Sequence, residues 1–290
     1  MSSTSTIHTS LALTIAGSDS SGGAGIQADL KTFSALGVYG ASVITAITAQ
    51  NTRGVQAAAA VDEALVAQQI ASVLSDLDIG AIKTGMLHNE KIVEVICSAL
   101  KQSSIPLVID PVMVATSGDR LLSADAITTL KEKLLSMATL ITPNLEEAAV
   151  LLNTHVAKNI DEIEQQAKQL LSLGCKAVLL KGGHLAEKHS ADVFVTENTA
   201  TKFFTGKILK RFAYEKIETQ NTHGTGCTLS AAITAYLAQG VDLLTAVTMA
   251  REYLYEALLH ADNLFISKEQ ISKTLSAKRH GPVHHFYRQW

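Results

Sequence analysis

Short runs of apolar residues alternate along the chain with amphipathic stretches of helical length. Continuous apolar runs are typical of strands that are buried on both faces. They predict strands at residues 11–16, 43–49, 81–87, 107–110, 140–142 and 177–180. Apolar residues at helical spacing predict helices at residues 24–36, 62–77, 90–100, 123–137, 145–152, 161–173, 228–238 and 243–260. This order of elements favours a mostly parallel sheet with helices on both faces.

The pattern changes in the stretch from residue 191 to residue 208. Two alternating segments, 192–196 and 201–205, flank a Glu-Asn-Thr turn and predict an antiparallel hairpin. No internal repeat, low-complexity tract or linker interrupts the chain. We therefore expect a single domain at residues 11–290, preceded by a flexible N-terminus at residues 1–10.

The composition is that of a globular protein with a large core, since 47% of the 290 residues are hydrophobic and 18% are charged. These values exclude a mostly disordered chain. The 24 basic and 27 acidic residues give a formal charge of −3, and no basic cluster is long enough to follow a nucleic-acid backbone. Nucleic acid is therefore not an expected partner. A small anionic ligand remains compatible with this charge, because it needs only a few well-placed donors.

The cysteines and the N-terminal sequence indicate a cytoplasmic protein. Cys97, Cys175 and Cys227 are far apart and have none of the CxxC spacings of zinc or redox sites. A reducing compartment explains them most simply. Residues 1–10 lack the basic and apolar regions of a secretory signal. No apolar run is long enough to predict a membrane span, so we do not expect a membrane partner.

The segment Asn221-Thr-His-Gly-Thr-Gly-Cys-Thr-Leu-Ser runs directly into an apolar helix. Gly224 and Gly226 allow a tight backbone turn, with Thr225 between them, that presents several N–H groups at the helix N-terminus. Such donors bind anions and would stabilise the charge of a phosphoryl group during its transfer. The alternative is a glycine turn that only starts a packed helix.

Cys227 lies in the first turn of that helix, where the helix dipole can lower the pKa of a thiol. Its side chain could accept the proton of a substrate hydroxyl or hold that hydroxyl in place. A buried structural cysteine is the alternative, and it is the interpretation we adopt for Cys97 and Cys175.

A second glycine-rich segment, from Gly17 to Gly25, follows the first predicted strand. It includes Gly23-Ala-Gly25-Ile-Gln-Ala28, which satisfies the dinucleotide-binding pattern G-x-G-x-x-A. That pattern also needs an acidic residue about twenty positions onward, and none occurs between Asp29 and Asp62. The P-loop pattern G-x-x-x-x-G-K-[ST] is absent as well. We therefore interpret the segment as the wall of a small-molecule pocket.

Polar residues follow several predicted strands, which is where ligands bind in parallel α/β sheets. Gln50 carries a carboxamide that can pair with the amino group and ring nitrogen of an aminopyrimidine, with a structural polar role as the alternative. Asp110 and Glu147 offer oxygens that suit Mg²⁺. Asn144 and Glu147 also match a helix capping box, which is compatible with a metal role. Lys181, before a Gly-Gly turn, offers a cation for phosphate.

The histidines lack the spacing of metal ligands, and we do not expect them to bind metal. They include His184, His223, His284 and His285.

These motifs together resemble those of a known enzyme group. Similarity to the ribokinase-like superfamily, in its branch that phosphorylates vitamin precursors, lies in Gly224-Thr-Gly-Cys227, Asn144-x-x-Glu147, Asp110 and Lys181-Gly-Gly-His. More narrowly, the chain resembles bacterial hydroxymethylpyrimidine/phosphomethylpyrimidine kinases in the segment from Leu13 to Asp29, in Ala49-Gln-Asn-Thr, in Lys83-Thr-Gly-Met-Leu, in the 221–227 turn and in the tail Gly281-Pro-Val-His-His-Phe. The resemblance begins at about residue 11.

The resemblance implies a kinase of thiamine biosynthesis that acts twice. It would phosphorylate 4-amino-5-hydroxymethyl-2-methylpyrimidine and then the resulting monophosphate, with ATP and Mg²⁺ as cofactors. It also implies a ribokinase-like α/β/α sandwich, a fold usually found as a homodimer.

The resemblance also implies roles for particular residues. The pyrimidine would contact Gln50, Gly17, Asp29, Met86 and Val112. The anion hole would be formed by Gly224, Thr225, Gly226 and Cys227, with Lys181 steadying the transferred phosphate. The nucleotide would be bound by Lys181, Asn144, Thr222 and Gly226, and the metal by Asp110 and Glu147. The hairpin at residues 192–205 is a candidate cover for the nucleotide.

Cys227 departs from the wider superfamily, in which many members have an aspartate base at this position. A thiol with an ordinary pKa of about 8.5 is a weaker general base at neutral pH. The acceptor of the second transfer is already an anion and needs less deprotonation. We therefore hypothesise that Cys227 matters more in the first transfer.

Two other functions remain as alternatives. The first is a pyridoxine or pyridoxal kinase of the same fold, because pockets that differ by a few contacts discriminate weakly. Gln50 and the segment around Met86 favour the pyrimidine. The second is a sensor that binds the pyrimidine without catalysis, which would not need Lys181, Asp110, Glu147 and the glycine turn.

Overall fold

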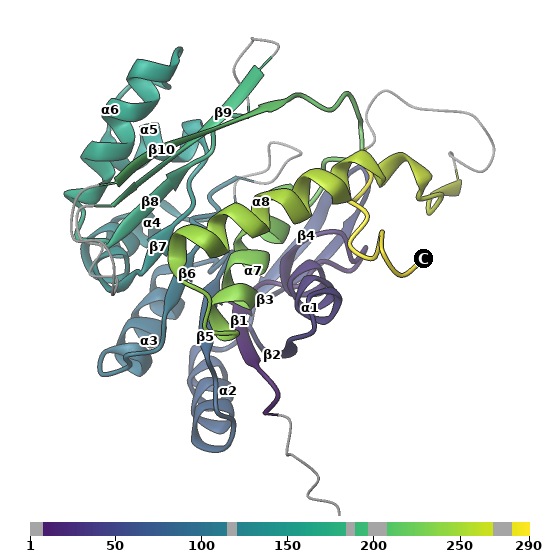
Figure 1. Cartoon of the computed structure of the whole chain (residues 1–290). Helices are drawn as coiled ribbons and strands as arrows, with labels where there is room; N and C mark the ends of the chain where they lie inside the picture. The colour runs from purple at the N-terminus through teal and green to yellow at the C-terminus, as the bar shows by residue number, and fades with distance from the viewer. Residues whose placement is uncertain (1–7, 115–120, 184–188, 197–207, 269–279) are drawn as a thin grey trace, which may run out of the picture.

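A computed structural model describes residues 8–114, 121–183, 189–196, 208–268 and 280–290. In this part of the chain, an eight-stranded sheet lies between two layers of helices, and a separate two-stranded sheet lies beside it (Figure 1). The expected α/β/α architecture with a mostly parallel sheet is confirmed.

The central sheet has the strand order β10-β9-β8-β7-β6-β5-β1-β2. The parallel strands are Leu11–Ala16 (β1), Tyr39–Ile44 (β2), Ala81–Thr84 (β5), Leu107–Ile109 (β6), Leu140–Ile141 (β7) and Ala177–Leu180 (β8). Because these strands run in the same direction, the residues that follow them meet at one edge of the sheet.

The remaining two strands are antiparallel, as expected, but the second has other bounds than the sequence predicted. His189–Thr196 (β9) pairs with β8 and with Ile208–Glu215 (β10), so that Ile208 lies opposite Thr196. The sequence predicted the second strand at residues 201–205, which lie outside the described residues. In the described part of the chain, the partner of β9 begins at Ile208.

The second sheet is a hairpin that the sequence analysis missed. The predicted strand at residues 43–49 is divided between β2 and Ala46–Asn51 (β3), and β3 pairs with Gly54–Ala60 (β4). Thr45 marks the division, because its N–H donates to the carbonyl of Ala16 while its hydroxyl donates to that of Met86. These bonds turn the chain out of the main sheet, so that β3 extends beyond the edge where ligands are expected.

Eight α-helices occur in the described residues. They are Gly25–Ala35 (α1), Glu63–Asp76 (α2), Glu90–Leu100 (α3), Ala124–Thr129 (α4), Leu145–Leu152 (α5), Ile160–Leu171 (α6), Thr225–Ala238 (α7) and Leu243–Leu259 (α8). All but α1 and α7 begin with a side-chain cap that accepts a backbone N–H, the strongest local start signal for a helix. None of these described helices is long and apolar enough to cross a membrane.

The segment predicted as one helix at residues 123–137 is irregular. Ser123 caps α4 as expected, since its hydroxyl accepts the Ala126 N–H at 3.3 Å. A π-helical turn, Leu130–Leu134, and a 3₁₀ turn, Leu135–Met137, follow it. The change of helical period keeps Leu130, Leu134 and Leu135 all buried.

The two faces of the sheet are covered by different helices. One face, with Leu13 and Ile15 of β1, packs against α2 to α6. The other face, with Ala12, Val108 and Leu140, packs against α1, α7 and α8, which lie in front of the sheet in Figure 1. Successive apolar side chains of each strand point to opposite faces of the sheet and so contribute to both cores. The helices α1 and α7 both start at the same edge of the sheet.

A buried ion pair joins α1 to β5. The Lys83 ammonium donates to Asp29 Oδ1 at 2.5 Å, and Thr14 donates to Asp29 Oδ2 at 2.6 Å. Both charged side chains are 0% exposed. Burial disfavours the ammonium, but the Asp29 carboxylate outweighs it and raises the pKa of Lys83 to about 12. The helix that follows the first glycine loop is thereby attached to the centre of the sheet.

Removal of one partner should destabilise the protein strongly, because it leaves the other charge buried and unpaired. We expect Asp29→Ala to lower the free energy of unfolding by roughly 3–5 kcal/mol, measured by urea denaturation. Glu63→Ala is the matched control, since it breaks an exposed pair with Lys91 and should leave the urea midpoint unchanged. An unchanged midpoint in Asp29→Ala would contradict the buried charge pair.

Candidate active site

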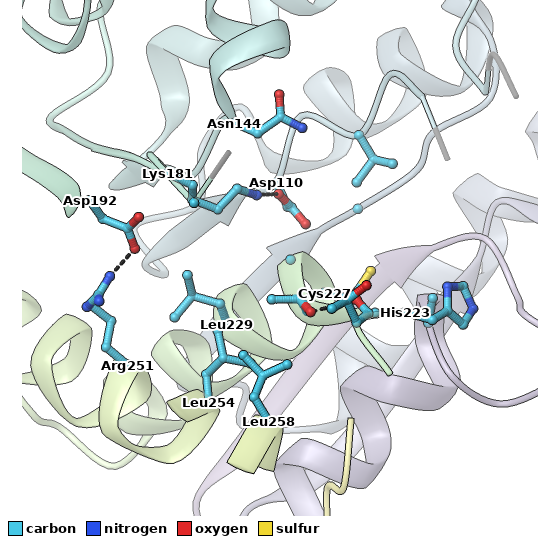
Figure 2. Close-up of a pocket in the computed structure, with 18 of the residues that line it drawn as sticks. Asp110, Asn144, Lys181, Asp192, His223, Cys227, Leu229, Arg251, Leu254 and Leu258 are labelled. Atoms are coloured by element: carbon cyan, nitrogen blue, oxygen red, sulfur yellow. Dashed lines mark hydrogen bonds and ion pairs between the residues drawn. The ribbon is translucent and has the colours of Figure 1, made fainter. Parts of the chain in front are cut away.

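A cavity of about 1230 Å³ opens at the edge where the parallel strands end (Figure 2). Its walls come from the residues after β1, β5, β6 and β8, from β3 and β10, and from the starts of α1 and α7. The two helices without side-chain caps, α1 and α7, both begin at this cavity, as does the capped helix α5. The uncapped N-termini of α1 and α7 favour an anionic ligand there.

The turn before α7 lies against the first glycine loop. Gly224 has a φ of 80°, and a Cβ on it would lie 1.9 Å from the Gly23 carbonyl oxygen. Only glycine allows this conformation and this approach. Thr225 begins the helix and donates its hydroxyl to the Thr222 carbonyl at 2.6 Å. The predicted anion-binding residues 224–227 and Thr222 all line the cavity.

Lys181 and Asp110 face the turn from the other side. The Lys181 ammonium donates to Asp110 Oδ1 at 3.1 Å, and Thr142 donates to the same oxygen at 3.1 Å (Figure 2). A Cβ on Gly226 would lie 3.2 Å from Lys181 Nζ and 3.5 Å from Asp110 Oδ2. Because Gly226 has no side chain, Lys181 and Asp110 can lie close to the backbone at the start of α7.

Asn144 and Glu147 form the predicted capping box. The Glu147 N–H donates to Asn144 Oδ1, and the Asn144 N–H donates to Glu147 Oε2, both at 2.8 Å. Burial raises the pKa of Glu147 to about 7, with the Lys181 cation opposing this and Asp110 adding to it. Glu147 therefore has a structural partner and also lies in the electrostatic environment of Lys181 and Asp110.

Asp110 and Glu147 could supply only some of the oxygen ligands that a cation such as Mg²⁺ needs. No group of three or more potential ligands among His, Cys, Asp and Glu occurs in the part of the chain that the structure describes. Mg²⁺ usually keeps several waters and takes one or two carboxylates together with substrate phosphates. The oxygens of Asp110 and Glu147, which share one wall of the cavity, fit this behaviour.

A group of uncharged residues also lines the cavity. Gly17, Gln50, Met86 and Val112 line it, as expected for a ring pocket. A Cβ on Gly17 would lie 2.4 Å from Met86 Cε, so glycine leaves room for that side chain. Gln50 is anchored through its backbone, because its N–H donates to Ser20 Oγ at 2.8 Å. The carboxamide is then presented from β3.

Asp29 does not belong to this lining. The sequence analysis placed it around the ring, but its carboxylate points into the protein toward Lys83 and Thr14. Lys83 does line the cavity. The reason is the helical position of Asp29, which faces the sheet rather than the strand ends.

The thiol of Cys227 is not activated by the helix start. Burial raises its pKa to about 11, although the Lys83 ammonium opposes this rise. The expectation that the helix dipole lowers this pKa is therefore wrong. Loss of solvation outweighs the dipole and the nearby cation.

The sequence analysis missed Asp19 and His223. Asp19 is 2% exposed, and it accepts the N–H groups of Ser21, Gly23 and Ala24. His223 Nε2 lies 2.8 Å from Asp19 Oδ2. An aspartate within a Ser/Gly loop is a recognised turn signal, which could have identified Asp19. No local signal pairs it with a histidine more than two hundred residues away.

A second group of lining residues that the sequence analysis missed comes from β9, β10 and α8. Arg251 of α8 forms an ion pair with Asp192 of β9 (Figure 2). The guanidinium also lies 4.4 Å from the ring centroid of Tyr214 and 5.0 Å from that of Phe212 on β10. These residues line the cavity.

The comparisons with known proteins agree with this geometry. The family model for phosphomethylpyrimidine kinase matches residues 19–272. A hydroxymethylpyrimidine/phosphomethylpyrimidine kinase of Rhizobium meliloti (strain 1021) is 51% identical over 282 residues, covering 97% of this chain and 99% of its own length. The crystal structure of phosphomethylpyrimidine kinase from Clostridium difficile 630 matches with a TM-score of 0.74 at 43% identity, covering 86% of this chain and 99% of its own.

A pyridoxal kinase has a similar fold. The ADP complex of Bacillus subtilis pyridoxal kinase matches with a TM-score of 0.81 at 34% identity, covering 97% of this chain and 99% of its own.

The raised pKa of Cys227 makes a measurable prediction about its reactivity. Alkylation by iodoacetamide should be slow at pH 7.5 and should rise about tenfold per pH unit toward pH 11, because only the thiolate reacts. Peptide mass spectrometry resolves Cys227 from Cys97 and Cys175. The urea-unfolded chain is the control, in which the same thiol should titrate near its ordinary value of about 8.5. Rapid alkylation of the folded protein at pH 7.5 would contradict the burial effect.

Proposed function

The chain belongs to the phosphomethylpyrimidine kinase family, and on this basis we propose that it phosphorylates 4-amino-5-hydroxymethyl-2-methylpyrimidine and then the monophosphate. The product would be the pyrimidine pyrophosphate used in thiamine biosynthesis. The observation that carries the proposal is the convergence in one cavity of the Gly224–Cys227 turn, the Lys181–Asp110 pair and the Gln50 carboxamide.

In the first transfer, the hydroxymethyl oxygen would attack the γ-phosphorus of ATP, the bond to the ADP oxygen would break, and the hydroxyl proton would pass to solvent water. The Gly224–Cys227 backbone would present N–H groups to the peripheral phosphoryl oxygens, where charge accumulates. Lys181, at 17% side-chain exposure, can reach the same oxygens while Asp110 orients it. The role of the protein is then mainly positioning and charge stabilisation.

The donor set of Asp110 and Glu147 supports Mg²⁺ as the metal. Bound there together with nucleotide phosphates, Mg²⁺ would neutralise their charge. Asn144 and Thr222 line the cavity and are proposed nucleotide contacts, along with Gly226 and Lys181.

Cys227 is proposed to position the substrate hydroxyl. With a pKa of about 11, the thiol is almost entirely protonated at neutral pH, so it can donate a hydrogen bond but seldom accepts a proton. Of the two roles considered for Cys227, we therefore propose that it holds the substrate hydroxyl in place and does not act as the base. This role retains the expected difference between the transfers, because the second acceptor is already an anion.

We also propose a cytoplasmic homodimer that binds neither nucleic acid nor membrane. The net charge of −3 supports the absence of nucleic-acid binding. The β3–β4 sheet exposes apolar surface that a second copy would cover, including Ile47 at 52% exposure.

Pyridoxal is the specific alternative substrate, because of the similarity to a pyridoxal kinase at 34% identity. We expect ADP release that depends on the pyrimidine, with kcat/KM at least about tenfold above that for pyridoxal, since a few pocket contacts are worth this much. A coupled ADP assay measures both substrates.

Lys181→Met is the control for that assay, and it should lose roughly 10²–10³-fold in kcat. A higher kcat/KM for pyridoxal would overturn the assignment. Ligand-induced thermal stabilisation without any ADP release would instead indicate a non-catalytic sensor.

Substitution of Cys227 separates the two transfers. Cys227→Ala should lower kcat of the first transfer at least about tenfold more than that of the second, because only the first acceptor needs its hydroxyl held. Cys227→Ser, which keeps a donor, should recover most of the first rate. Single-turnover measurements with the free pyrimidine and with its monophosphate test this, and equal losses in both transfers would disprove it.

A further inference from the structure

Asp19, His223 and Gln50 form a connected row of polar side chains along the ring pocket. His223 Nε2 lies 2.8 Å from Asp19 Oδ2 and 3.3 Å from the Gln50 amide nitrogen, Nε2. The three residues come from the loop after β1, the turn before α7 and strand β3, and all line the cavity. The row therefore joins the phosphate-binding turn to the ring-contacting amide.

Asp19 can act only as an acceptor in this row. Its two oxygens accept N–H groups from Ser21 at 2.8 Å, Gly23 at 3.0 Å and Ala24 at 2.8 Å. Burial disfavours the carboxylate, but hydrogen bonds from His223 and Ser21 outweigh it and hold the pKa of Asp19 at about 2. The proton between Asp19 and the imidazole must then be on His223 Nε2, whether the ring is neutral or charged.

The His223 ring is also held in place by the backbone around it. The backbone N–H of His223 donates to the Gly281 carbonyl at 2.9 Å. A Cβ on Gly23 would lie 2.5 Å from the ring and 3.1 Å from Pro282, so these segments pack closely. At 7% exposure, His223 has little freedom to turn Nε2 away from Asp19.

The partners of Gln50 determine the orientation of its amide. The Thr48 hydroxyl donates its single proton to the Ser18 carbonyl at 2.7 Å, so the Gln50 atom 3.3 Å from Thr48 Oγ1 is favourable only as a donor. The single Nε2 proton of His223 points at Asp19 and leaves that nitrogen without a lone pair in the ring plane, so the Gln50 atom beside it is favourable only as a second acceptor of the same proton. A half-turn of the amide, which leaves its shape unchanged, satisfies both contacts by placing Oε1 toward His223 and Nε2 toward Thr48.

We infer that His223, oriented by Asp19, fixes the Gln50 amide with Oε1 toward His223 and so determines which edge of a heteroaromatic ring the pocket accepts. The remaining lone pair and the remaining N–H of the amide require a ring edge with an adjacent donor and acceptor. An amino group beside a ring nitrogen supplies this pair. His223 is thus a positioning residue for specificity, and the inference rests on the proposed pyrimidine kinase function.

The test compares two ligands in the absence of nucleotide. Isothermal titration measures the affinity of 4-amino-5-hydroxymethyl-2-methylpyrimidine and of the analogue without the 4-amino group. We expect the wild type to prefer the amino compound at least about tenfold, and His223→Phe, which has no N–H, to reduce the ratio below about threefold. His223→Gln, which can restore a donor, should recover part of the preference.

The ratio of the two affinities shows whether His223 orients the Gln50 amide or only supports the fold. If His223 only supports the fold, both ligands should weaken equally in His223→Phe and the ratio should stay at its wild-type value, which would overturn the inference. Thr48→Val is a second variant that removes the other partner of the amide, and it should also lower the ratio. An affinity ratio that stays at the wild-type value in both His223→Phe and Thr48→Val would overturn the inference.

A failure of the proposed kinase function can be distinguished from a failure of the inference about His223. Failure of the kinase function would appear as a wild type that binds the pyrimidine but releases no ADP, whereas the ligand ratio needs no turnover. A wild type without preference for the amino compound would overturn the inference even if ADP is released.

Discussion

The site depends on the contact between two glycine turns that are far apart in the sequence. Gly224 approaches the Gly23 carbonyl so closely that any side chain at this position would overlap it. This contact brings the N-terminus of α7 beside the loop that follows β1. The backbone of the Gly224–Cys227 turn and the pocket wall formed by the loop after β1 are consequently held at a fixed separation by main-chain packing, and not by flexible side chains. Such pre-organisation is what transfer between two bound substrates needs.

Two buried pairs of a lysine and a carboxylate lie around this frame. Lys181 pairs with Asp110 and Lys83 pairs with Asp29, so each cation has a carboxylate that offsets the cost of its burial. The two lysines differ in access, because Lys181 is partly exposed to the cavity while Lys83 is not exposed at all. Of these two lysines, Lys181 has the side chain that is exposed enough to contact a ligand, although Lys83 also borders the cavity. Lys83 acts through its neighbours, and its opposition to the raised pKa of Cys227 is one such effect.

Much of the architecture follows from local sequence rules. Apolar runs without alternation identified the buried strands, and capping residues such as Ser123 and Asn144 marked where helices begin. Because ligands bind beyond the carboxyl ends of parallel strands, residues after those strands could be expected to meet. Asp110 and Lys181 do so beside the glycine turn. The division of the segment at residues 43–49 was not predictable, because it depends on bonds between Thr45 and distant carbonyls.

The sequence by itself determined which residues follow the strands, which turns require glycine, and which family the motifs of the Gly224–Cys227 turn resemble. Only the tertiary structure decided that Asp29 points away from the cavity, that burial raises the pKa of Cys227, and that Asp19 and His223 pair. The physical reason is the same in each case. A backbone conformation is largely set by neighbours in the chain, whereas the partner and the solvation of a side chain are set by segments that meet only after folding.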